Sequence, residues 1–324
     1  MANIRITQLD GSLPNIALMK LSHWHKAQGD TVHFSKSWQR DLFEPQYDTV
    51  YGSAIFKWTK PKLDRFLTEF PDAIVGGTGT TSTMTVEDIT NGEYEHFDYS
   101  LYPKFTHSIG FSQRGCRLKC GFCVVPGKEG KNRDNSSIEK IWRGEPHPKE
   151  IILLDNDFFG APGWQERSEE ILDGGYKVCF NQGINIRLIH EEGAAMLNRM
   201  PFFEAKFKYK RVHTAWDNLK DEKRFFKGLG ILLDAGIKPR DIMVYMLIGY
   251  WPGETMDDIL YRFNRLNDAG VLPYPMVFDR ENKEHKKFQR WVNRRYYQFV
   301  PWEEYDSSIR SKPRNDDAQL SLAI

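Results

Sequence analysis

Strand-like and helix-like segments alternate twice along this chain, over residues 1–80 and again over residues 108–280. Short apolar runs typical of buried strands are followed by longer segments whose apolar residues recur at helical spacing. Strands that alternate with helices usually pair in parallel, and the helices cover the faces of the sheet. The pattern therefore predicts an α/β protein, and a chain of 324 residues is long enough for two such domains.

The first 80 residues are expected to form a Rossmann-like domain with a parallel sheet. Proline suits the first turn of a helix, so Pro14 marks a helix start, and Gly29 closes that helix. A second helix is expected over 61–70, and a glycine turn, 76–79, follows the last strand. The expected strands lie at 4–8, 31–34, 50–56 and 73–75.

Residues 81–107 break this rhythm, because they are rich in Thr, Asp, Glu and Tyr and show no sustained period. We interpret them as a linker. From there, six strands are expected at 107–111, 150–154, 177–180, 211–215, 241–248 and 276–278, with the clearest helices at 219–235 and 255–269. Six strands are too few for a closed eight-fold barrel, so a partial, TIM-like (β/α)6 barrel is predicted over 108–280. A helical C-terminal extension and tail follow over 281–324.

Composition limits the classes of function open to the chain. Hydrophobic residues make up 40% and charged residues 27%, which is typical of a globular protein. The net charge of +1 disfavours a general polyanion binder, so nucleic-acid binding must be argued from local patches. No stretch approaches the roughly 18 apolar residues of a membrane span, and residues 1–13 lack the apolar core of a signal peptide. We expect a cytoplasmic protein without a membrane partner.

Three of the four cysteines, Cys116, Cys120 and Cys123, lie close together directly after an expected strand. A loop this tight can bring three thiolates to one inorganic cluster, but it supplies no fourth local ligand. Structural zinc takes four ligands, so Cys179 or His107 would have to complete a zinc site from elsewhere. Cys179 lies inside an apolar strand and is expected to be a buried small hydrophobe. We favour an iron–sulfur cluster with one open iron position.

The C-x3-C-x2-C spacing, with Phe122 before the last cysteine, resembles the signature of the radical S-adenosylmethionine (SAM) superfamily. Its place after the first strand of a six-fold barrel strengthens the resemblance. A second segment, 245–255, is similar to the superfamily's fifth-strand motif, in which an apolar strand ends in Gly and P-G-E-T opens a helix. The resemblance covers residues 105–280.

The resemblance implies a mechanism. The three clustered cysteines would ligate a single 4Fe–4S cluster, and SAM would chelate the fourth iron. One electron, from a donor such as flavodoxin or ferredoxin, would cleave SAM to a 5′-deoxyadenosyl radical that abstracts hydrogen from the substrate. The cofactor carries the hard chemistry, and the protein positions it and excludes water. No catalytic side chain is identified.

The resemblance also implies SAM contacts. Candidates along the adenine lie in the cysteine loop and at the end of the fifth strand: Phe122, Ile248 and Gly249. The usual glycine-glycine-acid motif after the second strand is absent, so Asn156 or Asp157 would hold the SAM amine. Gln182 follows the third strand and faces either the pocket or water. Arg187 would bind a carboxylate or pair with a surface acid such as Glu191.

Residues 1–80 resemble the cobalamin-binding domains attached to many radical SAM enzymes. Residues 53–55 approximate the S-x-L signature, and 76–77 match the G-G signature. The D-x-H-x-x-G signature fails, because residues 9–13 contain no histidine and His23 and His25 come too late. The lower imidazole ligand of cobalt is therefore missing. We favour a domain kept as a scaffold or lid without cobalamin over one that binds cobalamin without a protein ligand.

Several functions stay open at this level. Residues 1–107 contain no cysteine, which disfavours the second cluster of radical SAM methylthiotransferases. Residues 104–133 carry seven basic side chains and one acid, and residues 286–297 interleave basic and aromatic side chains. Both segments could bind nucleic acid. Alternatively, the first compensates the charge of the cluster, and the second docks a helix. The substrate is thus a small molecule or a nucleic acid. Alternatives are a cobalamin-dependent radical methyltransferase, a base-modifying radical SAM enzyme, and a non-enzymatic nucleic-acid-binding protein with a structural metal.

Overall fold

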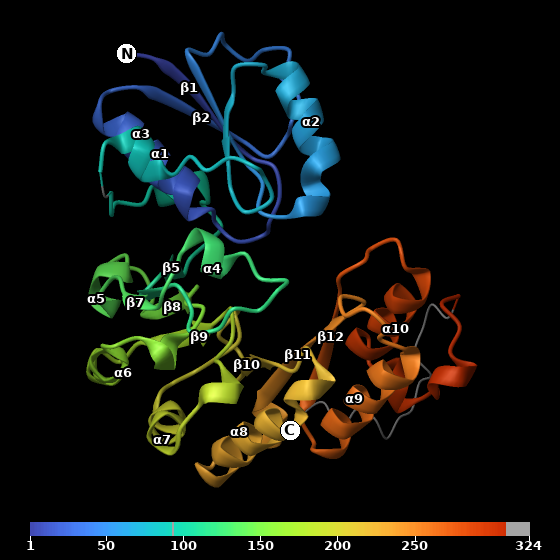
Figure 1. Cartoon of the computed structure of the whole chain (residues 1–324). Coiled ribbons are helices and arrows are strands. Elements are labelled where there is room, and N and C mark those ends of the chain that lie inside the picture. Colours follow the sequence, from blue (N-terminus) through green and yellow to red (C-terminus); the bar gives the residue numbers. More distant parts are fainter. Residues whose placement is uncertain (93, 309–324) are drawn as a thin grey trace. The chain divides into compact units, whose positions relative to one another are not determined.

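The structure is a computed structural model that describes residues 1–92 and 94–308, and the outer end of the expected tail lies outside them. The chain divides into two compact units, which we call the N-terminal unit, Met1–Ile109, and the C-terminal unit, Gly110–Ile324. Figure 1 follows the chain through both units from blue to red.

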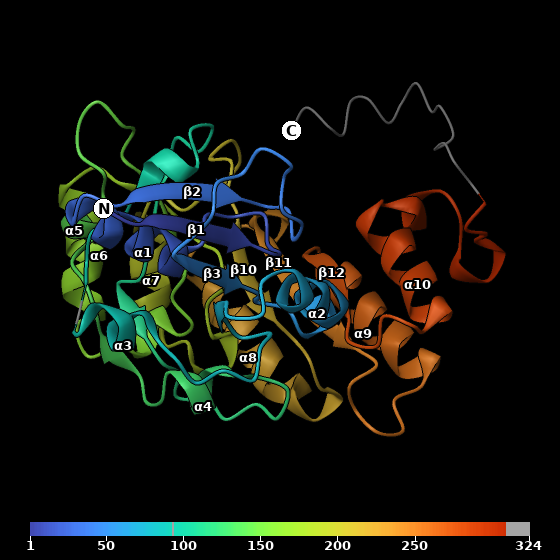
Figure 2. The same ribbon diagram turned by 90° about the horizontal axis from the view of Figure 1, so that it is seen from above.

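The N-terminal unit is built on a four-stranded parallel sheet with the order β2-β1-β3-β4. Its strands are β1 (Asn3–Gln8), β2 (Thr31–Ser35), β3 (Thr49–Ser53) and β4 (Ile74–Gly76). Its helices are α1 (Ile16–Ala27), α2 (Lys60–Glu69) and α3 (Val86–Thr90). Strands β2, β1 and β3 lie side by side in Figure 2. The side chain of Asn15 accepts the Leu18 N–H and starts α1 just after the proline that the sequence marked.

Apolar clusters hold this unit together. One packs Ile4 and Ile6 of β1 against α1 and α3, and another surrounds Phe66 of α2. Burying side chains of this size stabilises a fold by about 1.5–3 kcal/mol each. The parallel sheet with flanking helices agrees with the α/β expectation for this part of the chain.

Residues 81–107 contain ordered structure that the linker interpretation did not include. Helix α3 lies here, and so does a short 3₁₀ turn, η2 (Tyr99–Leu101). Leu101 and Tyr102 pack on Met19 of α1, and the Tyr102 hydroxyl donates to the side chain of Gln8 at 2.9 Å. The segment therefore adds packing and hydrogen bonds to the N-terminal unit.

The other strands form two three-stranded sheets, β5-β8-β9 and β10-β11-β12, and a two-stranded antiparallel ribbon, β6-β7. Strand β5 spans the boundary between the units, and the strands after it lie in the C-terminal unit. The strands are β5 (Ser108–Gly110), β6 (Gln113–Arg114), β7 (Arg133–Asp134), β8 (Glu150–Leu153), β9 (Lys177–Phe180), β10 (Val212–Ala215), β11 (Ile242–Ile248) and β12 (Leu272–Val277). The pairs β8–β9, β10–β11 and β11–β12 are parallel. The Ile184 N–H, just after β9, donates to the His213 carbonyl of β10, so the two sheets adjoin.

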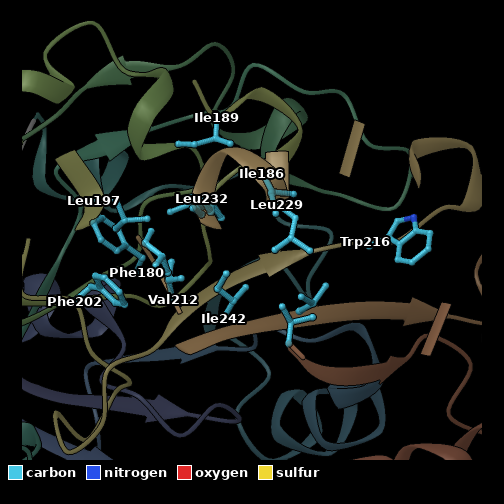
Figure 3. Packing of buried hydrophobic residues seen from close by; sticks show 14 of the residues in the cluster. Phe180, Ile186, Ile189, Leu197, Phe202, Val212, Trp216, Leu229, Leu232 and Ile242 are labelled. Carbon is cyan, nitrogen blue, oxygen red and sulfur yellow. The ribbon is translucent and has the colours of Figure 1, made fainter. Parts of the chain in front are cut away.

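Helices alternate with these strands. They are α4 (Val125–Lys128), α5 (Ile138–Ile141), α6 (Trp164–Asp173), α7 (Glu191–Arg199), α8 (Glu222–Asp234), α9 (Met256–Asp268) and α10 (Lys283–Asn293). Phe180 of β9, Val212 of β10 and Ile242 of β11 belong to one buried cluster (Figure 3). The helices contribute residues such as Leu197 and Leu229 to the same cluster. The molecule is thus a mixed α/β protein with parallel sheets.

The last strand is the one whose extent the sequence placed least well. Residues 276–278 were expected, but β12 begins four residues earlier and includes Pro273 and Pro275. Prolines usually argue against a strand, and here they lie on an edge strand, where they are tolerated. The Phe278 N–H donates to Ile248, so both prolines turn their backbone away from β11. The Pro275 carbonyl instead accepts from Gln289 of α10 at 3.0 Å.

No helix among residues 1–92 and 94–308 is long and apolar enough to cross a bilayer. The charged C-terminal helix α10 is amphipathic, and it packs its apolar face on the unit. Phe288 and Trp291 are buried in the main cluster of the C-terminal unit.

Candidate functional site

The cysteine loop, residues 115–132, joins the two short strands of the β6-β7 ribbon. The Cys116 N–H donates to the Gly130 carbonyl at 3.4 Å, and the Cys123 N–H donates to the Cys120 carbonyl at 3.0 Å. Gly115 has a φ of +80°, and a Cβ there would lie 2.2 Å from the Lys131 carbonyl oxygen. Only glycine fits this close approach. The ribbon therefore closes both ends of the loop and holds its three thiols on one short segment.

The three thiols are reduced and only partly buried. The Leu118 N–H donates to the Cys116 Sγ at 3.4 Å, and the Arg187 Nη2 donates to the Cys120 Sγ at 3.3 Å. Burial, together with the nearby charges of Asp157, Cys120 and Cys123, raises the pKa of Cys116 to about 11. Burial also raises the pKa of Cys123. Cys116 and Cys123 are therefore protonated near neutrality until a bound cation makes them thiolates.

Among residues 1–92 and 94–308, no three His, Cys, Asp or Glu side chains are arranged to hold a metal ion. A single zinc ion requires its ligands to converge on one point. An iron–sulfur cluster takes each thiolate on a different iron, so its ligands remain apart. Three free thiols on one short loop are the donor set that an iron–sulfur cluster takes from a protein, so the residues present fit such a group. Cys179 is fully buried in β9, and burial raises its pKa to about 12.

Asp157 anchors the cysteine loop to the end of β8. Its carboxylate accepts from the Arg117 Nε at 2.7 Å and from the Nη2 at 3.0 Å, and it also accepts from Asn132 at 3.0 Å. A bidentate Arg–carboxylate pair is among the stronger polar contacts in proteins. The side chain of Asp157 is almost fully buried, so the pair fixes the cysteine loop in place.

Asn156 and Asp155 extend this network. The Asn156 side chain donates to the Glu129 Oε2 at 3.2 Å, and the same oxygen accepts the Gly115 N–H at 3.0 Å. Asp155 is buried and accepts the backbone N–H and the hydroxyl of Ser112. Burial raises the pKa of Asp155 to about 7. Asn156 is thus the member of the 155–157 segment that both touches the cysteine loop and stays partly exposed.

The fifth-strand motif lies beside the cysteine loop. The rings of Phe122 and Tyr250 meet edge to face with centroids 5.4 Å apart. A Cβ on Gly121 would lie 2.8 Å from the Tyr250 hydroxyl, so the two loops touch. Sequence reasoning did not single out Tyr250. The only signal for it was its place directly after the Ile248-Gly249 strand end.

Hydrogen bonds hold the backbone turn at the end of this strand. Gly249 has a φ of +79°, and its N–H donates to the Glu254 Oε2 at 2.6 Å. Glu254 also pairs with the fully buried Arg262, which donates to the Leu247 carbonyl at 3.0 Å. The Ile248 side chain is fully buried in the main apolar cluster. The glutamate of P-G-E-T therefore fixes the path of the chain after β11.

Arg187 and Asp217 bring charge to the cysteine loop from two further segments. Arg187, in η4 (Ile186–Leu188), pairs with Asp221 at 2.7 Å rather than with Glu191. Asp217 follows β10, accepts the Leu247 N–H at 2.9 Å, and its negative charge contributes to the raised pKa of Cys123. Burial raises the pKa of Asp217 itself. Gln182 is exposed in the turn after β9.

A cavity of about 870 Å³ adjoins the cysteine loop at Leu118. Residues of η4, α7 and α8 form the rest of its lining. Ile186 and Ile231 give it apolar walls. Its charged lining consists of the bases Arg187, Arg224 and Lys227 and the acids Glu191 and Glu192. The cavity thus lies on the side of the loop where Arg187 reaches Cys120.

The residues that resembled a cobalamin cradle contact one another in the N-terminal unit. A Cβ on Gly77, whose φ is +102°, would lie 2.3 Å from the Ala54 carbonyl oxygen. The Ser53 hydroxyl accepts from the Asn15 side chain at 2.8 Å. His25 bonds to Asp30 at 2.8 Å, near the start of β2 rather than after β1. The side chains of Ser53 and His25 are thus engaged within the unit, and no step is assigned to cobalamin.

The basic segments found in the sequence have partners within the C-terminal unit. Arg114 pairs with Glu129 at 3.2 Å, and Arg117 with Asp157. On α10, the Lys287 ammonium lies 4.8 Å from the Trp302 ring centroid, and the buried Trp291 joins the main cluster. The contacts of α10 agree with docking of a helix, whereas Arg114 and Arg117 pair with carboxylates of the same unit.

Comparison with known proteins gives one distant relationship. The chain is 27% identical over 165 residues to the ribosomal protein uS12 methylthiotransferase RimO of Leptospira biflexa, in sequences from two strains of serovar Patoc. The match covers 45% of this chain and 35% of the relative, so it spans about a third of the length of these curated proteins. No family model matches the chain, and no solved structure matches it. This similarity supports a relationship to the radical SAM superfamily, and with it an enzyme.

Proposed function

We propose that this chain is a radical SAM enzyme that uses a single 4Fe–4S cluster held by Cys116, Cys120 and Cys123. The observation that carries the proposal is the closed cysteine loop, in which the Cys116 Sγ accepts a backbone N–H and the Cys120 Sγ accepts from the Arg187 guanidinium. When bound, the cluster and SAM supply a 5′-deoxyadenosyl radical that takes a hydrogen atom from the substrate.

The surrounding residues would stabilise the ligands and hold the loop still. Arg187 adds positive charge beside the Cys120 sulfur, which lowers the cost of keeping a thiolate there. Arg117 and Asp157 fasten the loop to the end of β8. Hydrogen bonds to ligand sulfurs also tune the potential of such clusters, so Arg187 is expected to affect it.

The SAM contacts are assigned from the same geometry. Both carboxylate oxygens of Asp157 are engaged by Arg117, so Asn156 is the better candidate for the SAM amine. Phe122 and the backbone of Gly249 remain the candidates beside the adenine. The Ile248 side chain is buried in the core, so only its backbone would face the ligand. Gln182, exposed after β9, would lie nearer the substrate.

The proposed architecture accounts for where these residues gather. Strands β5, β8, β9, β10, β11 and β12 follow one another in sequence and in neighbourhood, as in a partial (β/α)6 barrel. The loops after β8, β10 and β11 carry Asn156, Asp217 and Tyr250. In such a barrel the chemistry lies at the carboxyl ends of the strands. We propose that the N-terminal unit is a Rossmann-like scaffold or lid.

The reaction is proposed only as far as hydrogen abstraction. The RimO relatives are methylthiotransferases by name, but this chain has one set of three clustered cysteines and a buried Cys179. Sulfur transfer is therefore not proposed for it.

Anaerobic reconstitution of the full chain tests the proposal. We expect about four irons per chain and 5′-deoxyadenosine on addition of SAM and dithionite. A Cys179→Ala variant serves as the matched control and should keep both. A colourless protein that binds one zinc ion and yields no 5′-deoxyadenosine would overturn the proposal.

We also propose that a small acidic electron donor, such as flavodoxin or ferredoxin, docks over the cavity beside Leu118. Arg224 and Lys227 are exposed at its rim, and Arg187 leads from it to Cys120. Replacing Arg224 and Lys227 by Ala should weaken flavodoxin binding measured by calorimetry, while reduction by dithionite stays unchanged. Unchanged flavodoxin binding would refute the docking site alone.

A further inference from the structure

A second basic feature lies in the connection between α7 and β10, residues 204–211, which we call the lysine loop. Its sequence is Glu-Ala-Lys-Phe-Lys-Tyr-Lys-Arg. Four of the last six residues are basic, and the only acid is Glu204. Neither the cysteine site nor the comparisons account for it.

Glu204 is used to build the loop. Its Oε2 accepts the Lys206 N–H and its Oε1 accepts the Lys208 N–H, both at 2.9 Å. The Glu204 N–H donates to the Tyr209 carbonyl at 3.0 Å, which closes the turn. The single acid therefore orders the backbone instead of pairing with a lysine ammonium.

Phe207 anchors the middle of the loop. Its side chain is only 7% exposed, and its φ of +56° is unusual for a bulky residue. Strained residues of this kind persist only where the surrounding structure holds them, and they cluster at functional sites. The buried Phe207 fixes the turn, while Lys206 and Lys208 on either side are exposed.

The cations of the loop lack acidic partners. Lys206, Lys208 and Lys210 are exposed, and none forms an ion pair within the part of the chain that the structure describes. The Lys210 ammonium lies 5.6 Å from the Phe202 ring centroid. Arg211 is affected by the nearby charge of Arg295, and Asp241 and Glu204 partly offset it. The three exposed lysines therefore carry the charge that would attract a polyanion.

Tyr209 decides which polyanion fits best. It stands between Lys208 and Lys210 in the sequence and is 67% exposed, compared with 45% for Tyr261 and 37% for Tyr274. An acidic protein surface needs the charges but has no need of an exposed ring. A single-stranded nucleic acid uses both, because its phosphates pair with lysine and its bases stack on aromatic rings.

We propose that the lysine loop is a binding site for single-stranded nucleic acid, with Lys206, Lys208 and Lys210 at phosphates and Tyr209 stacked on a base. The loop precedes β10, whereas Asp217, near Cys123, follows that strand. The two sites therefore lie at opposite ends of β10. This inference does not rest on the cluster chemistry, and it holds or fails independently of it.

Fluorescence anisotropy of the full chain with a fluorescein-labelled oligouridylate of roughly 20 nucleotides tests the site. Replacing the three lysines by Ala should weaken binding at least about tenfold and reduce the salt slope by about two. The matched control replaces three exposed lysines elsewhere, Lys220, Lys223 and Lys238, and should change the affinity less than about twofold.

The tyrosine separates nucleic acid from any other polyanion. Tyr209→Ala should weaken oligouridylate binding about fivefold or more, whereas Tyr209→Trp should preserve it, because a stacking ring is kept. Neither variant should alter competition by polyglutamate. Circular dichroism and iron content report whether each variant folds. Equal losses in both lysine triples, no effect of Tyr209→Ala, or no binding at low salt would each overturn the proposal.

Discussion

The two units use the same edge of a parallel sheet in opposite ways. In the N-terminal unit, Asp10 follows β1 and binds the loop after β3, accepting the Ile55 N–H at 2.8 Å and the Thr59 hydroxyl at 2.6 Å. Gly77, after β4, presses against the Ala54 carbonyl. The polar groups at this edge thus form hydrogen bonds with one another.

In the C-terminal unit, the corresponding loops leave reactive groups within reach of one another. The cysteine loop, Asn156 and Tyr250 come from separate segments and meet beside partly exposed thiols. Open α/β sheets bind ligands at this edge, but topology alone does not create a site. The two units differ in whether the side chains at this edge bond to one another or surround partly exposed thiols.

The cysteines should give the largest difference between the units. Each of Cys116→Ala, Cys120→Ala and Cys123→Ala should lose most of the bound iron and all 5′-deoxyadenosine formation, because a cluster iron loses its ligand. Gly77→Ala should retain iron, since it alters only the N-terminal unit. Iron analysis and absorbance spectra check this. Equal iron loss from Gly77→Ala would break the contrast.

Two buried aspartates should respond oppositely to pH. Asp155 has a pKa raised to about 7 by burial, so its favourable contribution is complete below about pH 4 and is lost as pH rises toward 7. The C-terminal unit should therefore be less stable at pH 8 than at pH 5, by at most about 3 kcal/mol. Asp155→Asn should remove that slope in guanidinium unfolding of the unit.

Asp98 gives the matching test in the N-terminal unit. Burial alone would raise its pKa, but hydrogen bonds from Lys26, Ser100 and Ser22 lower it to about 2. Its contribution is therefore complete above about pH 4 and is lost as pH falls through 2. Hydrogen exchange of β1 should be insensitive to pH between 5 and 8, after correction for intrinsic rates. A slope there that Asp98→Asn removes would contradict the assignment.

Glycine replacements measure how tightly the N-terminal edge is packed. Gly77→Ala should destabilise that unit by about 2–3 kcal/mol, since the positive φ and the Ala54 contact both oppose a Cβ. Gly29 has a φ of +85° with nothing within 4 Å, so Gly29→Ala should cost only about 1 kcal/mol. Urea unfolding monitored by hydrogen exchange compares them, and equal costs would show that the contact is unimportant.

The smallest effect is expected at the anchor of the cysteine loop. Asp157→Asn leaves Arg117 with a weaker partner and should cost about 1–2 kcal/mol locally. It should speed iron release to a chelator several-fold without changing the initial iron content. Glu150→Gln, at the exposed pair with Lys177, is the control and should leave the release rate unchanged.

Local patterns allowed much of the fold to be predicted. The strand at 177–180 agrees with β9 because a short apolar run before a polar turn is unambiguous. Helix α3 was not predicted, since it has only five residues and depends on the Thr85–Asp88 capping box and on tertiary packing. Prolines concealed the first part of β12.

In the candidate site, too, local features could be predicted from the sequence and contacts between distant residues could not. The cysteine spacing is local, so the sequence alone revealed the loop. Arg117 and Asp157 are 40 positions apart, and Arg187 and Cys120 are 67 apart, so their contacts depend on how the strands assemble. No periodicity encodes such pairs. They required the structure.

The prolines of β12 have one more consequence. Pro273 and Pro275 offer no donors along the outer margin of the last strand, and α10 already occupies the Pro275 carbonyl. A further strand approaching residues 273–275 would find no donor at either proline and would find the Pro275 carbonyl already engaged. Another copy of the chain, a neighbour's β-segment or an aggregating peptide therefore cannot extend the sheet there by regular pairing. The two prolines therefore limit growth of the sheet at this edge through the chemistry of the backbone.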